Sequence, residues 1–104
     1  MTSEQETLWS VIFTGKSRKQ KTKLPPEISS AFDLLYGELE KEGPERTHWP
    51  HYGKIVGKPD MHHCHLNKGR PTYVAVWKVT DRTVKLMEAR YVGTHGGANY
   101  RRID

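Results

Sequence analysis

The sequence has a single cysteine, Cys64, and no long run of apolar residues. One cysteine excludes an intramolecular disulfide, so the fold must be held by its core alone. No apolar stretch approaches the length that a signal peptide or a membrane span requires. We therefore expect a cytoplasmic protein that does not insert into a membrane.

Acidic residues are in the minority. The 104 residues include 17 Lys and Arg against 12 Asp and Glu, which gives a formal net charge of +5. Counterion release draws such a chain to polyanions, although charge alone does not separate RNA from DNA. Residues 1–25 and 53–104 are net basic and residues 26–52 net acidic. We expect one face turned toward a polyanion and another turned away from it.

The chain length predicts a single domain, residues 1–104. Residues 8–14 are rich in aromatic and β-branched side chains and predict a strand that ends at Gly15. Residues 16–24 carry basic and no acidic side chains and are interpreted as a short basic helix or a solvated loop. From Pro26 to Gly43-Pro44, apolar residues at spacings of four, three and four predict an amphipathic helix. Its apolar stripe is Ile28, Phe32, Leu35 and Leu39.

The second half predicts an irregular connection followed by three strands. Residues 45–60 hold prolines and glycines and are long for a loop, which indicates a function or a short undetected element. Residues 62–68, 71–79 and 83–92 predict an antiparallel meander. In the middle strand, Tyr73, Ala75, Trp77 and Val79 are expected to face the helix, and Thr72, Val74, Val76 and Lys78 to face outward. The predicted class is α+β: an N-terminal strand and one or two helices packed on an antiparallel sheet of about four strands.

The run His62-His63-Cys64-His65 is the densest cluster of reactive side chains. Because side chains alternate along a strand, His63 and His65 share one side, roughly 6.7 Å apart, and His62 and Cys64 share the other. These residues therefore cannot all bind one ion. A zinc site combining the first pair with His48 or His51 is an alternative, but no CxxC motif or ordered ligand spacing supports it. We expect Cys64 in the core and neither a metal nor a cofactor.

Two histidines on a solvent-facing strand suit acid–base catalysis at neutral pH. Cutting RNA without a metal needs a base for the 2′-hydroxyl, an acid for the leaving oxygen and cations around the phosphate. The cations on or beside the predicted sheet are Lys68, Arg70, Lys78 and Arg90. His95 follows the last strand, and Tyr100 offers a ring for stacking a base. The alternatives are solvated charges, structural histidines and a tyrosine that covers the edge of the core.

Three stretches carry a resemblance to a known family. They are residues 63–66 (HCHL), 73–79 (YVAVWKV) and 91–95 (YVGTH), in that order. Together with the early strand, the basic segment and the apolar helix, they resemble the RelE/ParE superfamily of bacterial toxins, and within it the RelE-like and YafQ-like messenger RNA interferases. The resemblance covers most of the chain and implies a RelE-like fold.

The resemblance also implies roles for individual residues. His65 or His63 would act as the base, His95 as the acid, and Tyr100 would orient the nucleotide. Two positions depart from the family. The carboxylate of YafQ-like proteins has no match among residues 67–69. The arginine of RelE-like proteins is replaced by Val74, so Arg70 or Lys68 would supply that charge.

Members of this family commonly cleave messenger RNA in the ribosomal A site, and a cognate antitoxin neutralises them. The implied function is therefore a toxin of a type II toxin–antitoxin system that acts as a metal-independent endoribonuclease. Its implied partners are messenger RNA, the ribosome and the antitoxin. The basic segment would contact ribosomal RNA through Lys16, Arg18, Lys19, Lys21 and Lys23. Two alternatives stay open: a ParE-like inhibitor of DNA gyrase with the same fold, and a noncatalytic nucleic-acid-binding domain.

Overall fold

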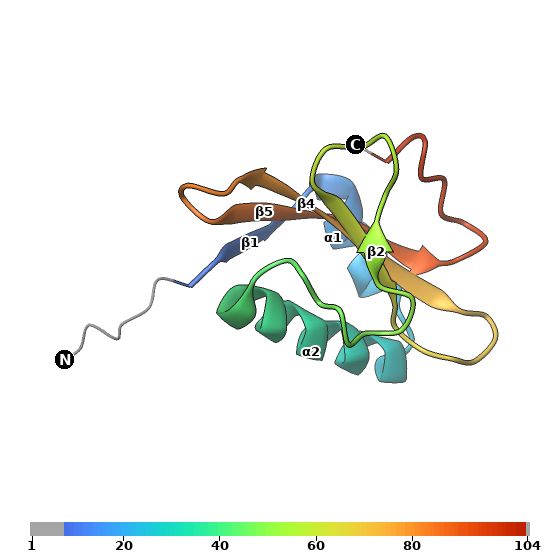
Figure 1. The fold of residues 1–104 in the computed structure, drawn as a ribbon. Coiled ribbons are helices and arrows are strands. Elements are labelled where there is room, and N and C mark those ends of the chain that lie inside the picture. Colours follow the sequence, from blue (N-terminus) through green and yellow to red (C-terminus); the bar gives the residue numbers. More distant parts are fainter. Residues whose placement is uncertain (1–7, 104) are drawn as a thin grey trace.

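The computed structural model describes residues 8–103, which form two helices and five strands in one mixed sheet. The strands lie in the order β1-β5-β4-β3-β2. Helix α2 lies along one side of this sheet, and the C-terminal segment after β5 returns on the other side (Figure 1). The predicted α+β class is confirmed. The sheet has one more strand than expected and contains a parallel pair.

The predicted meander is present with small shifts of its bounds. Strands β3 (Met61–His65), β4 (Tyr73–Asp81) and β5 (Leu86–Thr94) pair antiparallel in sequence order. The long connection before them contains β2 (Gly53–Lys54), which pairs antiparallel with β3 and places Gly53 opposite His63. This is the short element that the length of the connection indicated.

Strand β1 (Ser10–Phe13) pairs parallel with β5 and stops at Ala89. The basic segment follows as helix α1 (Gly15–Thr22) and covers the edge of β5 that β1 leaves open. The Ser17 hydroxyl donates to the Ala89 carbonyl (2.7 Å), and the Val92 amide donates to the Gln20 side chain (3.1 Å). These bonds satisfy polar groups that an uncovered edge strand would expose.

A capping box at Thr14 starts α1. The Ser17 amide donates to the Thr14 hydroxyl oxygen, and the Thr14 amide donates to the Ser17 hydroxyl oxygen. Each bond satisfies an amide that the first turn of a helix leaves unpaired. Lys19 and Lys21 lie in the last turn, where positive charge is favourable. The basic segment is therefore a helix, which resolves the choice that the sequence left open.

Helix α2 (Pro26–Glu42) has the predicted bounds and buries the predicted stripe. The stripe packs against Cys64, Ala75, Trp77 and Val79 on the facing side of the sheet. The Tyr36 hydroxyl donates to the Val11 carbonyl (2.6 Å), which ties α2 to β1. Gly43 ends the helix with a φ of 95°, a conformation that favours glycine.

The expectation that the other side of β4 faces solvent is wrong. Val74 and Val76 are 0% and 1% exposed, and Thr72 and Lys78 are half-buried. The reason is the segment after β5, which folds back over this side of the sheet. The His95 amide donates to the Thr72 carbonyl (2.6 Å), and the Tyr100 ring lies 5.5 Å from the His63 ring. The sheet is thus covered on both faces.

Within residues 8–103, neither helix combines the length and the hydropathy needed to cross a bilayer.

Candidate active site

The histidine run occupies β3, and its side chains alternate as the sequence predicts. His62 and Cys64 are fully buried on the side that faces α2. His63 and His65 lie opposite Val76 and Val74 on the other side of the sheet and are half-buried. The expected position of Cys64 in the core is confirmed. His63 and His65 are less exposed than a solvent-facing strand would leave them, because the C-terminal segment lies beside them.

Three imidazole rings from three separate segments meet at His65. The His51 ring is stacked on it with centroids 4.2 Å apart, and the His95 ring meets it edge-on at 5.3 Å. Backbone hydrogen bonds hold both neighbours in place. The His65 amide donates to the Pro50 carbonyl (2.8 Å), and the His95 amide donates to the Thr72 carbonyl (2.6 Å). We call His51, His65 and His95 the histidine cluster.

The sequence reading missed His51 as a catalytic candidate. It placed this residue in the irregular connection and considered it only as a possible zinc ligand. One local sign marks it in the structure: its φ is 54°, in the left-handed region that residues other than glycine seldom adopt. Such conformations are concentrated at functional sites. No sequence pattern reports the tertiary contact that brings this loop onto β3.

His65 lines two adjoining surface pockets. One, of about 420 Å³, is also lined by His95, Thr72 and Arg70. The other, of about 270 Å³, is also lined by His51, Asn67 and Lys68. The structure therefore brings two of the predicted cations, Arg70 and Lys68, to either side of the central histidine. A bound phosphate here could meet an imidazole and a cation together.

Burial lowers the pKa of His65, and positive charge on His51 and His95 lowers it further. Burial also lowers the pKa of His63, with His51 as the next contribution. A lowered pKa keeps an imidazole neutral and able to accept a proton at pH 7. Both histidines therefore suit the part of a base.

His63 is more enclosed than His65. Its Nδ1 is buried and has no hydrogen-bond partner among the described residues. Gly53 of β2 lies close to its other nitrogen: a Cβ at position 53 would come 3.5 Å from Nε2. Tyr100 closes the remaining side, and burial raises the pKa of its phenol. His63 and Tyr100 thus form a ring pair behind the histidine cluster.

Most of the other predicted RNA-binding residues lie away from the cluster. Lys78 is opposite Met61 and Glu88, toward the other end of β3 from His65. Lys16 and Arg90 line a separate pocket, and Lys23 lines a third with Tyr73 and Tyr91. Lys19 lies in the last turn of α1.

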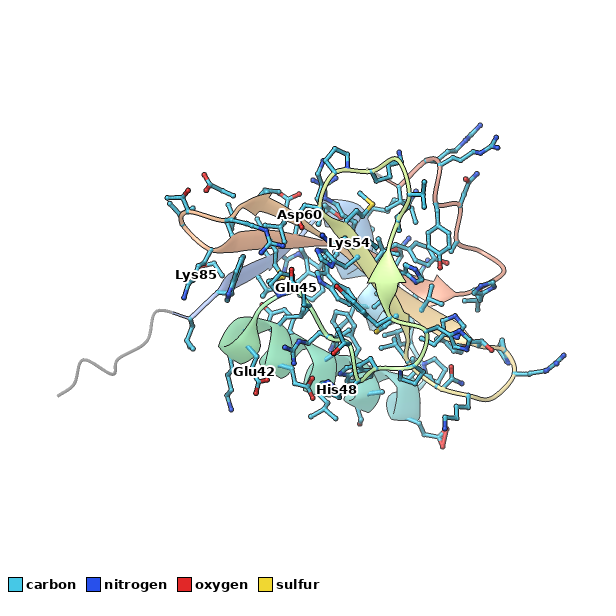
Figure 2. All side chains as sticks on the ribbon, in the orientation of Figure 1. Glu42, Glu45, His48, Lys54, Asp60 and Lys85 are labelled. Atoms are coloured by element: carbon cyan, nitrogen blue, oxygen red, sulfur yellow. The ribbon has the colours of Figure 1, made fainter. Side chains whose placement is uncertain are left out.

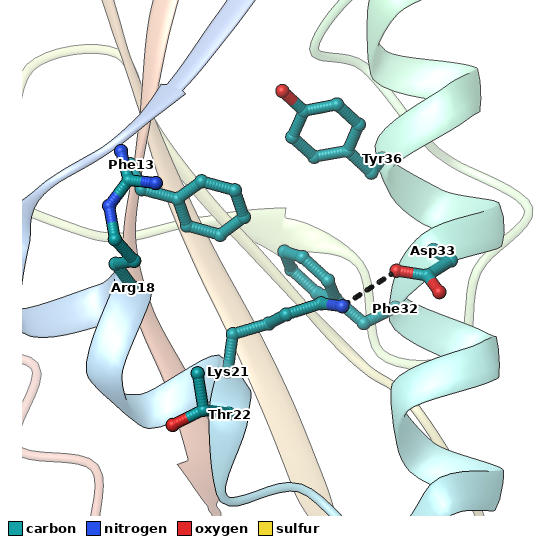
Figure 3. A pocket seen from close by; sticks show the side chains of 7 residues that line it. All are labelled: Phe13, Arg18, Lys21, Thr22, Phe32, Asp33 and Tyr36. Carbon is teal, nitrogen blue, oxygen red and sulfur yellow. Dashed lines mark ion pairs between the residues drawn. The ribbon is translucent and has the colours of Figure 1, made fainter.

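Arg18 and Lys21 line an apolar pocket of about 260 Å³ between α1 and α2 (Figure 3). The Arg18 guanidinium lies over the Phe13 ring at 5.7 Å, and Lys21 forms an ion pair with Asp33 at 3.1 Å. Two of the basic side chains of α1 are therefore engaged by α2 and β1.

A chain of polar side chains that begins at the buried His62 and ends at the surface supports the site from the other face of β3. His62 lies 2.7 Å from the Tyr52 hydroxyl through Nδ1 and 2.9 Å from Asp60 through Nε2. Because the carboxylate can only accept, Nε2 carries the proton and Nδ1 accepts from Tyr52. Arg82 joins Asp60 to Glu45, and Figure 2 shows these two carboxylates near each other. The Arg82 hydrogen bond lowers the pKa of Asp60 to about 2.

Within residues 8–103, no group of three or more His, Cys, Asp or Glu side chains is arranged to hold a metal ion.

The chain is similar to known proteins in its structure but not in its sequence. No protein-family model matches the chain, and no curated protein sequence matches it significantly. A double-arginine mutant of the Escherichia coli toxin RelE in the free state superposes with a TM-score of 0.67 at 19% identity, covering 86% of this chain and 87% of that one.

Two complexes give similar values. A chain of the archaeal RelE–RelB complex from Pyrococcus horikoshii has a TM-score of 0.65 at 20% identity, covering 89% of this chain and 100% of that one. A chain of the RelBE2 toxin–antitoxin complex from Mycobacterium tuberculosis has a TM-score of 0.62 at 21% identity, covering 85% and 99%. At these identities the likeness is one of architecture, and the chain has the fold of the RelE toxins.

Proposed function

We propose that this chain is the toxin of a toxin–antitoxin system and acts as a metal-independent endoribonuclease on messenger RNA. The observation that carries the proposal is the histidine cluster: His65 lies between two further imidazoles and opens to pockets lined by Arg70 and Lys68. The fold shared with RelE toxins supports it.

His65 is the proposed base because its pKa is lowered and it opens to the pockets, whereas His63 is enclosed. It accepts the proton of a ribose 2′-hydroxyl, and that oxygen attacks the adjacent phosphorus. The P–O5′ bond breaks, and protonated His95 gives its proton to the departing 5′-oxygen. The products are a 2′,3′-cyclic phosphate and a 5′-hydroxyl. Arg70 and Lys68 stabilise the negative charge that gathers on the phosphate.

The remaining residues of the site have positioning roles in this proposal. His51 is stacked on His65 and fixes the orientation of its ring. Tyr100 orients the nucleotide with its ring, and His63 holds Tyr100 from behind.

The partners follow from the same proposal. Two of the solved complexes with this fold pair RelE with RelB or are named toxin–antitoxin complexes, so we propose a cognate antitoxin as the protein partner and the cytoplasm as the compartment. Cleavage takes place on the ribosome, where basic side chains of α1 and its C-cap contact ribosomal RNA. Lys19 and Lys23 have no acidic partner within residues 8–103 and are available for that contact.

Substitution of single histidines tests the proposal. His65→Ala and His95→Ala should each lower RNA cleavage by about 10²- to 10⁴-fold. The matched control is His48→Ala, because His48 is 62% exposed and pairs with Glu38 outside the site. Cleavage is measured on messenger RNA with and without ribosomes, in EDTA, with the product ends identified and folding checked by circular dichroism.

Three results would contradict the proposal. Full cleavage by both variants would show that the histidine cluster takes no part in the reaction. Growth arrest that survives both substitutions while gyrase is inhibited would favour the ParE-like alternative. RNA binding without any cleavage by the wild type would favour the noncatalytic one.

A further inference from the structure

We propose that a second pocket, formed by Lys16, Arg90 and Arg102, binds a backbone phosphate of the RNA strand next to the one that is cut. This inference rests on the proposed function and adds a binding site to it. The pocket has a volume of about 330 Å³, and Tyr91, Gly97 and Asn99 complete its walls. We call it the cationic pocket.

Three separate segments bring these cations together. Lys16 comes from the first turn of α1, Arg90 from β5 and Arg102 from the C-terminal segment. The last of these is held by a hydrogen-bonded turn, in which the amides of Arg102 and Ile103 both donate to the Asn99 carbonyl (2.9 and 3.1 Å). The pocket is therefore built by tertiary structure and is more than a cluster of neighbouring surface charges.

The charges in the pocket are not balanced. Glu88 neutralises one terminal nitrogen of Arg90 at 2.6 Å. Lys16 and Arg102 have no acidic partner within residues 8–103. The Nε of Arg90 is buried and has no hydrogen-bond partner there either. A buried cationic donor without an acceptor is costly, and an anion in the pocket would remove that cost.

A phosphate fits this arrangement better than a carboxylate or a halide. Its several oxygens can accept from two guanidinium groups and an ammonium at once, and arginine is suited to bidentate contact with such a group. Asn99 and Thr14 also line the wall. Because Lys16, Asn99 and Arg102 are exposed, the pocket opens to solvent, as a phosphate that is still attached to a chain requires.

The pocket lies close to the histidine cluster, so the RNA strand that is cut at the cluster is the ligand we assign to it. Gly97 lies in its wall, and His95 is two residues earlier, so their Cα atoms are at most about 7 Å apart. The Tyr91 hydroxyl donates to the Thr94 carbonyl (2.8 Å), and the Gly97 amide donates to the Thr94 hydroxyl oxygen (3.1 Å). These bonds fix the short segment between the two sites. A strand cut at the cluster would place a neighbouring phosphate in the cationic pocket.

The test uses the full chain and an RNA oligonucleotide with 2′-O-methyl groups throughout, which no 2′-hydroxyl attack can cut. Arg102→Gln and Lys16→Gln should each weaken its binding by about tenfold. Each should also lower the slope of log K against log salt by about 0.7. The matched controls are Arg101→Gln, which removes the same charge from the neighbouring position, and Lys41→Gln, which removes it from the last turn of α2, outside the pocket. These should bind like the wild type.

A second arm identifies the phosphate. Methylphosphonate, which is uncharged, replaces one phosphate of the oligonucleotide at a time. At one position the difference in affinity between the wild type and Arg102→Gln should vanish. At that position the uncharged linkage has already removed the contact that the substitution would remove. Equal binding by Arg102→Gln and Arg101→Gln, or no such position in the scan, would overturn the inference.

Inorganic phosphate is the third arm. If it binds the wild type as tightly as the oligonucleotide does, and Arg102→Gln abolishes that binding, the pocket is a site for a free anion and the assignment to RNA is wrong. Cleavage is measured separately on unmodified RNA. Normal cleavage together with no effect of Arg102→Gln on binding would contradict only the assignment of the cationic pocket. Absent cleavage together with the expected binding pattern would contradict only the proposed nuclease activity.

Discussion

The hydroxyl of Tyr52 lies 2.7 Å from Nδ1 of His62, so the residue after His51 is anchored to the buried side of β3. Tyr52→Phe removes this bond and leaves a buried nitrogen without a donor. We expect a loss of about 1–3 kcal/mol in the free energy of unfolding, measured by urea titration. The His51 loop should also become less ordered, which would lower kcat for RNA cleavage more than it changes KM.

Tyr73→Phe is the matched control for this change. Tyr73 is also half-buried, but no side-chain hydrogen bond is formed by its hydroxyl within residues 8–103. It should keep the stability of the wild type. Equal stability and activity of the two variants would show that the Tyr52 contact has no role.

Stability should fall as the pH is lowered through the range around 6.5. Burial lowers the pKa of His62 in the folded protein, while the unfolded chain has the ordinary value near 6.5. The unfolded state therefore binds more protons in this range, and stability is full above the unfolded pKa and lost below it. The limiting slope for one such histidine is about 1.4 kcal/mol per pH unit.

Urea titrations between pH 7.5 and 5 check this expectation. Asp60 contributes in a different window, because its lowered pKa matters only between about 4 and 2. A stability that stays constant from pH 7.5 to 5 would contradict the assignment of a neutral His62.

The acidic limb of the cleavage profile should lie below pH 6.5, because His65 must be neutral to act as the base and its pKa is lowered. His51 is one cause of that lowering. His51→Gln should therefore raise the pKa of His65 and move the limb to higher pH, as read from kcat/KM between pH 5 and 8. His48→Gln should leave the profile in place. A shift in the opposite direction would exclude His65 as the titrating base.

The two adjacent leucines of α2 give a matched test of the core. Leu35 is 0% exposed and Leu34 is 61% exposed. Leu35→Ala should cost about 2–5 kcal/mol because it leaves a cavity under the sheet, whereas Leu34→Ala should change stability by less than about 0.5 kcal/mol. Similar losses in the two variants would mean that the register of α2 on the sheet is wrong.

Local patterns predicted the parts of this fold that are decided locally. The stripe from Ile28 to Leu39 reports one buried helix face, and all of its members are buried. Alternation along β3 separated Cys64 from His63 and His65 correctly. Helix α1 could not be settled in this way, because its capping box uses Ser17 where an acidic residue is usual and its support comes from distant β5.

The features that the sequence did not predict depend on contacts between distant segments. Val74 and Val76 belong to an apolar run, but the sequence does not show what would cover them, and the C-terminal segment returns over their side of the sheet. The sequence pattern indicated His95 and Tyr100, and the resemblance implied their roles, but nothing in the sequence placed His51 on His65. That contact depends on one carbonyl, Pro50, which accepts from β3. A loop conformation of this kind produces no periodic pattern in the sequence.

The pairing of β1 with β5 brings the first strand beside the last. A chain emerging from the ribosome makes β1 well before β5, the strand with which it pairs. Contacts of such long sequence separation form late in folding. The sheet therefore stays open at this edge until β5 has been made, and a product truncated before Leu86 should remain without a closed core.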